Sequence, residues 1–294
     1  MKGSNLDRCH LYKDQPEKLQ FSLYPLREYL RENVTLSTQP HIHSFYQIIW
    51  FYEGKGEHHV DFQSYPVHPH TLFFIAKDQV HAFDHETYEG VLLHFNESFL
   101  VHYAPDIDIV LKYNIFNNYQ LDPCVQLPPE LIPTLSTLMS QMEQELTYQN
   151  QFGTKDLLTY LTKAFLILIE RLHRQTDPLH SIYRVSDEKH VQFLRFRELL
   201  ENHFKKGTTV SAYADLLNLS PKSLTDLTNK LAHKTPSQLI QERVILEAKR
   251  LLVHSSLSIK EIGYSLSFED PSYFVKYFKK YTQMTPRAFR ESTS

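Results

Sequence analysis

The stretches VSAYADLLNLSPKSL at residues 210–224 and SIKEIGYSLSFEDPSYFVKYFKK at residues 258–280 decide the fold of the last third of this 294-residue chain. Apolar and small residues recur in both with the same spacing and a constant offset of 49 positions. The matching positions are Val210, Ala214, Leu217 and Leu219 in the first stretch and Ile259, Gly263, Leu266 and Phe268 in the second. A repeat at a fixed offset indicates a duplicated structural unit. Helical spacing on both sides of a polar residue, Asn218 or Ser267, predicts two helix-turn-helix units.

The interior of each predicted unit follows from the same pattern. A small residue, Ala214 or Gly263, stands one turn after the first apolar residue, where a crossing helix must approach closely. At the turn, we expect Asn218 to adopt the left-handed backbone conformation readily and Ser267 less readily. The expected core positions of the second helices are Leu224, Leu227 and Leu231 in the first copy and Phe274, Tyr277 and Phe278 in the second.

Helix boundaries are also visible in the sequence. Ser258, with Glu261 three residues later, predicts a capping box, and Ser220-Pro221 supplies an N-cap and a first-turn proline. Between the copies, residues 236–252 carry apolar side chains at helical spacing. One helix of this length can hold the two units at a fixed separation, so that their recognition helices enter successive major grooves about 34 Å apart.

Together with KTPSQLIQERVILEAKRLL at residues 234–252 and TPRAFR at residues 285–290, the two stretches closely resemble the DNA-binding domain of the AraC/XylS family of transcription regulators. The resemblance covers residues 190–291, and the second half is the more specific. Three positions depart from the family pattern. Ser267 and His233 stand where a glycine is usual, and Asp226 stands where several members have a basic residue.

The resemblance implies which side chains contact DNA. The residues at the base-contact positions are Lys222, Thr225 and Asp226 in the first unit and Pro271, Ser272, Val275 and Lys276 in the second. Lysine can donate to guanine, aspartate can accept from cytosine, and valine can contact the methyl group of thymine. Phosphate contacts, which position a protein without specifying sequence, are expected from Lys279, Lys280 and Arg287 and from helix N-termini at Ser211 and Ser258.

An all-β region precedes this helical part. Residues 45–52, 57–62, 71–75 and 90–95 read as short strands separated by turn residues, which favours a sandwich or small barrel. Both faces of the strand at residues 45–52 are apolar or aromatic, so we expect one face to line the interior and the other to lie under helices. Two amphipathic helices are expected at residues 131–148 and 157–172.

The stretch PHIHSFYQIIWF at residues 40–51 and its continuation to residue 95 resemble the cupin-type effector domain that often accompanies this DNA-binding domain. If the odd-numbered face of the strand points inward, it lines a pocket that suits an aromatic acid or a sugar. The expected pocket residues are His43, Phe45, Gln47, Ile49, Phe51 and His81. The alternative is a filled core with no ligand. His58, His59, His68 and His70 sit near turns and are expected to face solvent.

In cupin enzymes a His-x-His pair, a nearby carboxylate and a later histidine bind a metal, and the corresponding residues here are His41, His43, Gln47 and His81. Three imidazoles could hold Fe(II) or Zn(II), but an amide in place of the carboxylate is a poor ligand. We therefore expect no metal and no other cofactor, and keep His41, His43 and His81 as the metal candidates.

The predicted fold is an α+β two-domain protein: an N-terminal cupin-like β-barrel with a helix pair, and a C-terminal all-α domain of two helix-turn-helix units joined by a linker helix. The effector domain is expected at residues 1–130 and the helix pair, which such regulators commonly use to dimerise, at residues 131–175. A polar linker at residues 176–187 then leads to the DNA-binding domain at residues 188–294.

Charge and composition agree with this division. Residues 186–294 carry 17 basic and 12 acidic side chains, whereas residues 1–185 carry 14 and 22, so the positive charge lies where a polyanion would bind. The chain has only Cys9 and Cys124, and its first residues lack an apolar segment. Both observations favour the cytoplasm.

The composition and motifs favour a sequence-specific transcription regulator, not an enzyme, that responds to a small-molecule effector. Its expected partners are double-stranded promoter DNA, the effector, a second copy of the chain and, if it activates, RNA polymerase; no membrane is expected. The alternative is a metal-dependent cupin enzyme that carries a DNA-binding domain. A DNA-repair protein of the alkyl-transfer class would need a cluster of thiolates, which two cysteines do not supply.

Overall fold

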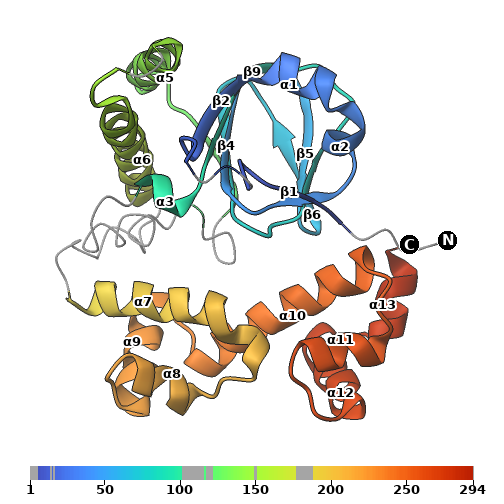
Figure 1. Ribbon diagram of the computed structural model, residues 1–294. Helices are drawn as coiled ribbons and strands as arrows, with labels where there is room; N and C mark the ends of the chain where they lie inside the picture. Colours follow the sequence, from blue (N-terminus) through green and yellow to red (C-terminus); the bar gives the residue numbers. More distant parts are fainter. Residues whose placement is uncertain are drawn as a thin grey trace. The chain divides into compact units, whose positions relative to one another are not determined.

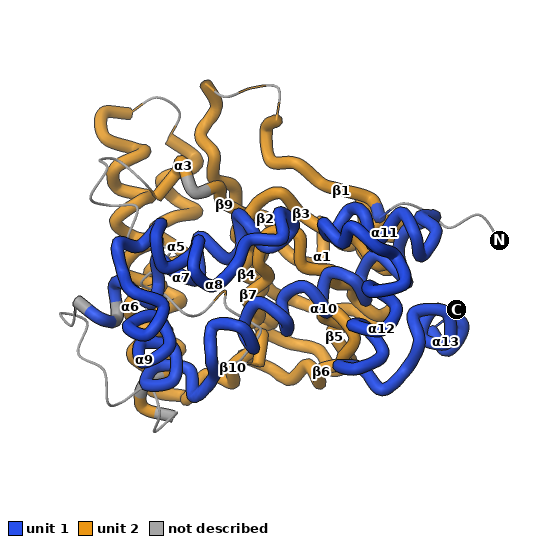
Figure 2. The backbone as a smooth tube through the Cα atoms, turned by 90° about the horizontal axis from the view of Figure 1, so that it is seen from below, with its two compact units in different colours: residues 1–6, 183–294 blue, residues 7–182 orange. Residues whose placement is uncertain are grey.

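The computed structural model describes residues 6–13, 15, 17–100, 116, 122–148, 151–176 and 188–293. Two compact domains share the chain (Figure 2). We call residues 7–182, unit 2 of the figure, the sheet domain, and residues 183–294 with the first six residues, unit 1 of the figure, the helical domain. The linker predicted at residues 176–187 lies, apart from Thr176, outside the described residues. Among the described helices, none is long and apolar enough to cross a membrane.

The sheet domain contains two five-stranded sheets that face each other (Figure 1). Their strand orders are β1-β3-β8-β5-β6 and β10-β7-β4-β9-β2. The strands are β1 Asp7–Cys9, β2 Phe21–Pro25, β3 His41–His43, β4 Tyr46–Glu53, β5 Gly56–Val60, β6 Gln63–Val67, β7 Thr71–Ile75, β8 His81–Phe83, β9 Glu89–Phe95 and β10 Cys124–Gln126. The helices are α1 Leu26–Glu32, α2 Val34–Thr38, α3 Glu97–Leu100, α5 Ile132–Thr147 and α6 Thr154–Thr176. The four strands and two helices expected from the sequence are all present, with small shifts at their ends.

Strand β4 is buried on both faces, as expected. On one face, Ile48 and Trp50 belong to the same apolar cluster as Met139 of α5 and Phe165 of α6. On the other face, Ile49 packs with the interior side chains of the opposite sheet. Burial of each such side chain contributes about 1.5–3 kcal/mol, so β4 anchors the helix pair and the barrel interior at once.

The helical domain contains helices and no strands among its described residues. Its helices are α7 Glu188–His203, η3 Phe204–Lys206, α8 Val210–Leu216, α9 Pro221–Ala232, α10 Pro236–His254, α11 Ile259–Ser265, α12 Pro271–Thr282 and α13 Pro286–Ser292. The predicted repeat is confirmed: α8 with α9 and α11 with α12 form two helix-turn-helix units joined by α10 (Figure 1). Leu224 and Phe274 are fully buried in the core of the helical domain. A Cβ atom on Gly263 would lie 3.3 Å from the Cβ of Phe274, which explains the small residue there.

The predicted caps are confirmed with one correction. Ser258 and Glu261 form the reciprocal capping box of α11, and the Ser220 side chain accepts from the backbone N–H of Ser223 at the start of α9. However, α8 begins at Val210 with Thr209 as its N-cap, so Ser211 is the second residue of the helix and not its terminus. The Thr209 hydroxyl accepts from the Ala212 N–H at 3.2 Å, a bond that Ser211 cannot make from inside the first turn.

Left-handed backbone occurs at the two positions where the family pattern has glycine. Ser267 has φ 62° and His233 has φ 52°, and Asn218 has φ 54° in the equivalent turn of the first unit. Ser267 was expected to adopt this conformation less readily, but its hydroxyl donates to the Lys205 carbonyl oxygen, which helps to hold it. The departures from glycine therefore change the side chain and leave the turn conformation as the family pattern requires.

The two units differ by one residue in their turns. Up to Leu219 and Phe268 the repeat has an offset of 49 positions, but Ser220, the N-cap of α9, corresponds to Asp270, the N-cap of α12, at an offset of 50. The additional residue is Glu269. The second helix of the second unit therefore begins one residue later than the repeat of the first helices predicts.

Candidate functional site

One face of α9 and one face of α12 carry the residues expected to contact base edges. Lys222 and Asp226 are exposed on α9, with Thr225 half-buried between them. At the offset of 50, Ser272 and Lys276 are exposed on α12, with Val275 half-buried between them. Positions three and four apart share one helix face, and Leu224 and Phe274 occupy the opposite, buried faces. Pro271, half-buried, is the first residue of α12.

Local hydrogen bonds fix what these side chains can offer. The Thr225 hydroxyl donates to the Pro221 carbonyl oxygen at 2.8 Å, so it can accept from a base but has no proton left to donate. The Asp270 carboxylate accepts from the Ser272 N–H at 2.8 Å and stabilises the first turn of α12. Lys222, Asp226 and Lys276 extend from the surface as charged groups.

The residues expected to contact phosphate are all exposed. Lys279 and Lys280 lie in the last turn of α12, and Arg287 donates to Glu291 at 2.9 Å within α13. At the N-terminus of α11, the Glu261 carboxylate accepts from the Ser258 N–H at 2.7 Å, and hydrogen bonds from Ser258 lower the pKa of Glu261. A phosphate approaching Ser258 must therefore compete with a carboxylate already in place.

The sheet domain brings three of the predicted histidines together. His41 and His43 lie on β3 and His81 lies opposite His41 on β8. All three are buried, and one ring nitrogen from each lies within 4.8 Å of the others. His41 Nδ1 is 2.9 Å from the Gln39 carbonyl oxygen, which orients that ring.

Two further histidines join this cluster, and sequence reasoning missed both. His58, expected to face solvent, is fully buried on β5, with its Nε2 3.2 Å from His81 Nδ1. That prediction was wrong because β5 pairs with β8 and alternates, so His58 points inward while His59 is exposed as predicted. His68 is also exposed, and His70 is half-buried.

His94 is buried on β9, where it pairs with Gln47 of β4. Its ring centroid lies 4.7 Å from Phe45 and 6.1 Å from His43. The signal for His94 lay in the predicted strand GVLLHF, but only the pairing of β9 with β4 places it beside the other histidines.

Burial keeps this cluster uncharged. It lowers the pKa of His94 to about 3 and holds the pKa values of His43, His58 and His81 well below that of a solvated imidazole. Neighbouring histidines add to the effect at His43, His58 and His81, since a positive charge on one disfavours a positive charge on the next. Neutral imidazoles can both donate and accept hydrogen bonds and can bind metal ions.

Several buried polar atoms in this cluster have no hydrogen-bond partner among the described residues. They are both ring nitrogens of His43, Gln47 Oε1, His58 Nδ1, His81 Nε2 and His94 Nε2. Of the six residues expected to line a pocket, His43, Phe45, Gln47 and His81 are buried in the histidine-rich part of the interior. Ile49 and Phe51 are equally buried but belong to an apolar cluster, where the Phe51 ring lies 4.9 Å from Tyr88 and 5.7 Å from Phe73.

Comparison with known proteins assigns both parts of the chain. Residues 28–162 match the family of AraC-like ligand binding domains, and residues 213–292 match a family of helix-turn-helix domains. The transcriptional activator RhaS of Escherichia coli strain K12 is 24% identical over 254 residues, which are 85% of this chain and 87% of RhaS.

The similar solved structures cover either about a third or nearly all of this chain. The C-terminal domain of the response regulator yesN from Fusobacterium nucleatum is 29% identical, with 32% of this chain and 93% of that one covered and a TM-score of 0.32. ToxT from Vibrio cholerae is 15% identical, with 92% and 97% covered and a TM-score of 0.41. From the two domain matches and the similarity to RhaS, the chain belongs to the AraC family of transcriptional regulators, with an AraC-like ligand-binding domain joined to a helix-turn-helix DNA-binding domain.

Proposed function

We propose that this regulator binds a small-molecule effector among the buried histidines of its sheet domain, and that the effector changes how α9 and α12 engage promoter DNA. The observation that supports the proposal is the set of unpartnered buried atoms on His43, Gln47, His81 and His94. Proteins leave few buried polar atoms unpartnered, and each costs about 1–3 kcal/mol. A polar ligand that hydrogen-bonds to several of them would recover this energy only on binding.

The chemistry of the cluster suits an aromatic acid or a sugar. The imidazoles offer donors and acceptors, and the ring of Phe45, 4.5 Å from that of His43, offers a flat apolar surface. Binding of small molecules to neutral hydrogen-bonding groups beside aromatic rings is common in protein pockets. The choice between the two ligand classes is left to experiment.

A thermal-shift screen of aromatic acids and sugars on the full chain tests this proposal. A ligand at 100 times its Kd adds about 2.7 kcal/mol to the stability of the state that it binds. We expect one class to raise the melting temperature of the wild type and not that of a folded His43→Phe variant. An equal shift in that variant would place the ligand elsewhere, and so would binding to residues 183–294 alone.

A second candidate, favoured by the three histidines within 4.8 Å, is a metal ion. Ligating nitrogens around tetrahedral zinc lie about 3.4 Å apart, so the pairs need to close by at most about 1.4 Å. His41 and His81 each have one ring nitrogen engaged, by the Gln39 carbonyl oxygen and by His58, which is how metal-binding histidines are usually oriented. His41, His43 and His81 would hold the ion, which would supply a Lewis-acidic position for the effector.

Metal analysis separates the two candidates. About one equivalent of zinc or iron after purification, lost in both His43→Ala and His81→Ala, would favour the metal. Wild-type protein that is free of metal and still responds to its effector on operator DNA would exclude it. A metal-dependent cupin enzyme, the alternative function, additionally requires turnover of a substrate; we propose no enzymatic activity.

We also propose that Lys222, Thr225 and Asp226 of α9, and Pro271, Ser272, Val275 and Lys276 of α12, contact base edges. Phosphate contacts are assigned to Ser211, Ser258, Lys279, Lys280 and Arg287. The second unit follows the family pattern more closely, so its assignments carry the sharper test.

Replacing Lys276 by alanine is expected to weaken operator binding by about 1–3 kcal/mol and to spare non-specific binding, because a base-edge contact is lost and the phosphate contacts remain. Fluorescence anisotropy on an operator selected in vitro and on a scrambled duplex measures both. Lys260→Ala is the matched control, since its ammonium lies 5.8 Å from the Tyr264 ring on the other helix of the unit. Equal losses on both duplexes would contradict a base-reading role for Lys276.

The helix pair is proposed to form a homodimer. Leu157, Tyr160 and Ile167 lie on one face of α6 and are 46%, 63% and 39% exposed, although they are apolar. A second copy would cover this face and place two pairs of recognition helices on one operator. We further propose that the protein acts in the cytoplasm, where its promoter DNA lies, and contacts RNA polymerase if it activates.

The double change Tyr160→Glu and Ile167→Glu is expected to convert the dimer to monomers, because two buried charges would oppose association. Light scattering after size-exclusion chromatography measures the mass. Leu216→Glu, which places a charge at another exposed apolar residue, is the control and should leave the dimer intact. An unchanged mass for the double variant would rule out this face of α6.

A further inference from the structure

The two helix-turn-helix units are connected by more than the linker helix α10. The short segment Phe204–Gly207, which we call the clamp segment, follows α7 and lies between α10 and the turn of the second unit. It contacts both. The clamp segment is therefore a second, noncovalent connection between the two units.

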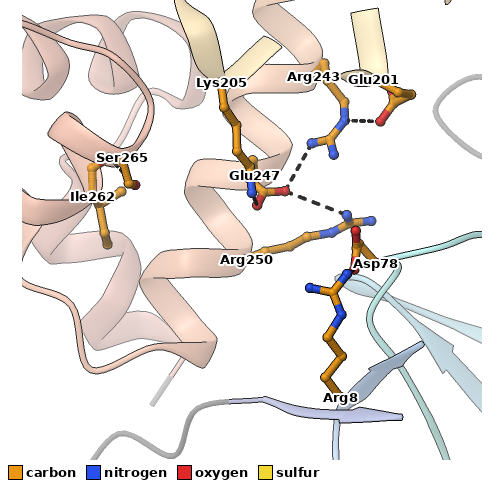
Figure 3. A network of polar contacts seen from close by, with 9 residues as sticks. All are labelled: Arg8, Asp78, Glu201, Lys205, Arg243, Glu247, Arg250, Ile262 and Ser265. Carbon is orange, nitrogen blue, oxygen red and sulfur yellow. Dashed lines mark hydrogen bonds and ion pairs between the residues drawn. The ribbon is translucent and has the colours of Figure 1, made fainter. Parts of the chain in front are cut away.

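The contact with α10 is a network of charges in which the α10 side chains are buried and their partners Lys205 and Glu201 are partly exposed (Figure 3). Arg243 is 5% exposed, and its guanidinium lies 3.7 Å from the centre of the Phe204 ring. Arg243 also donates to Glu201 at 2.8 Å and to Glu247 at 3.2 Å. Lys205 pairs with the other oxygen of Glu247 at 2.6 Å. A cation over an aromatic ring and charge pairs centred on the buried Arg243 and Glu247 hold the segment on α10.

The charge of Glu247 is maintained in spite of its burial. Burial raises the pKa of Glu247, but the charges of Arg243, Lys205 and Arg250 outweigh it, so that the pKa lies below its ordinary value. Glu247 thus stays ionised at neutral pH and keeps its pair with Lys205.

The contact with the second unit is made by Ser267, in the turn between α11 and α12. Its hydroxyl donates to the Lys205 carbonyl oxygen. Gly207, at φ 65°, lies so close that a Cβ atom on it would be 3.4 Å from the Cβ of Ser267. One residue, Lys205, therefore reaches α10 with its ammonium and the second turn with its carbonyl.

We propose that the clamp segment sets the separation and angle of α9 and α12, and that Ser267 is the positioning residue through which it acts. The second helix-turn-helix unit already packs on α10 through α11, α12 and α13, and the bond at its turn adds a further constraint from the side of α7. The proposal rests on DNA binding by both units. It assigns to Ser267 a role in recognising the spacing between two half-sites, without contact to any base.

Ser267→Gly tests the proposal with little disturbance of the backbone. Glycine adopts a φ of 62° without strain, so the turn is kept while the hydroxyl that bonds Lys205 is removed. Asn218→Gly is the matched control, because Asn218 occupies the equivalent turn of the first unit at φ 54° and its side chain makes no hydrogen bond to the described residues.

The measurement uses the full chain and an operator selected in vitro from random duplex DNA, with zero, one or two base pairs inserted or removed between its half-sites. We expect Ser267→Gly to reduce the preference for the selected spacing by about two- to tenfold, the value of one net hydrogen bond. Lys205→Met, which removes the pair with Glu247, should act in the same direction, and Asn218→Gly should retain the wild-type profile.

Three outcomes would overturn the proposal: an unchanged spacing profile in Ser267→Gly, an equal loss of affinity at every spacing, or the same change in Asn218→Gly. A melting temperature for each variant confirms that it is folded. Failure of the wild type to select any DNA would instead count against DNA binding itself.

Discussion

Lowering the pH from 7 to 5 is expected to destabilise the sheet domain, by about 2 kcal/mol through His94 alone and further through the other buried histidines. His43, His58, His81 and His94 are buried, and burial holds their pKa values low, at about 3 for His94. In the unfolded chain the same side chains titrate near 6.5.

The sign follows from proton uptake. Below pH 6.5 the unfolded state binds protons that the folded state refuses, so the free energy of unfolding falls as the pH falls towards the folded pKa values. His94, with a folded pKa of about 3, contributes about 1.4 kcal/mol per pH unit in this window, or about 2 kcal/mol between pH 6.5 and 5. His43, His58 and His81 act in the same direction. Above pH 6.5 the four groups have no further effect.

Urea titrations followed by tryptophan fluorescence measure this loss. The chain has one tryptophan, Trp50, which is fully buried on β4, so its emission reports the unfolding of the sheet domain. His94→Phe should reduce the pH dependence by about 1.4 kcal/mol per unit. A free energy of unfolding that is constant between pH 7 and 5 would disprove the expectation.

The affinity of residues 183–294 for DNA is expected to fall at least about 40-fold when salt rises from 50 to 200 mM. Lys279, Lys280 and Arg287 alone would neutralise three phosphates, and each released counterion contributes a slope of about 0.9 in the logarithm of affinity against that of salt. The fragment is a compact unit with its own apolar core, so it is suited to the measurement.

Replacing Lys279 and Lys280 together by glutamine should lower that slope by about 1.8. Lys234→Gln is the control, because its ammonium already pairs with Glu242 at 2.8 Å within the protein. Anisotropy titrations at four salt concentrations give the slopes. If the double variant has the wild-type slope, these lysines do not contact phosphate.

Local signals made the helical unit predictable. Caps, turn residues and the spacing of Ala214 and Gly263 act within a few residues of each other, so the sequence alone indicated both helix-turn-helix units and the linker helix. The error at Ser211 was one of degree, since Thr209 is an equally good N-cap two residues earlier.

The sheet-rich unit was predicted less completely because its short strands depend on distant partners. β3 and β8 have three residues each, and β6 contains Pro66, so neither length nor composition marked them. The same dependence hid part of the candidate site. His58 and His94 join the cluster only through the pairing of β5 with β8 and of β9 with β4.

The additional residue Glu269 matters for anyone who would recode this regulator by exchanging its reading helices. A transplant of α9 into the place of α12 that follows the 49-residue repeat would be out of register by one position, which rotates a helix by about 100° about its axis. Side chains meant for the groove would turn towards the protein, and Leu224 and Leu227 would turn towards solvent. A working chimera must instead be cut at the N-caps, Ser220 and Asp270, where the two copies return to a common frame.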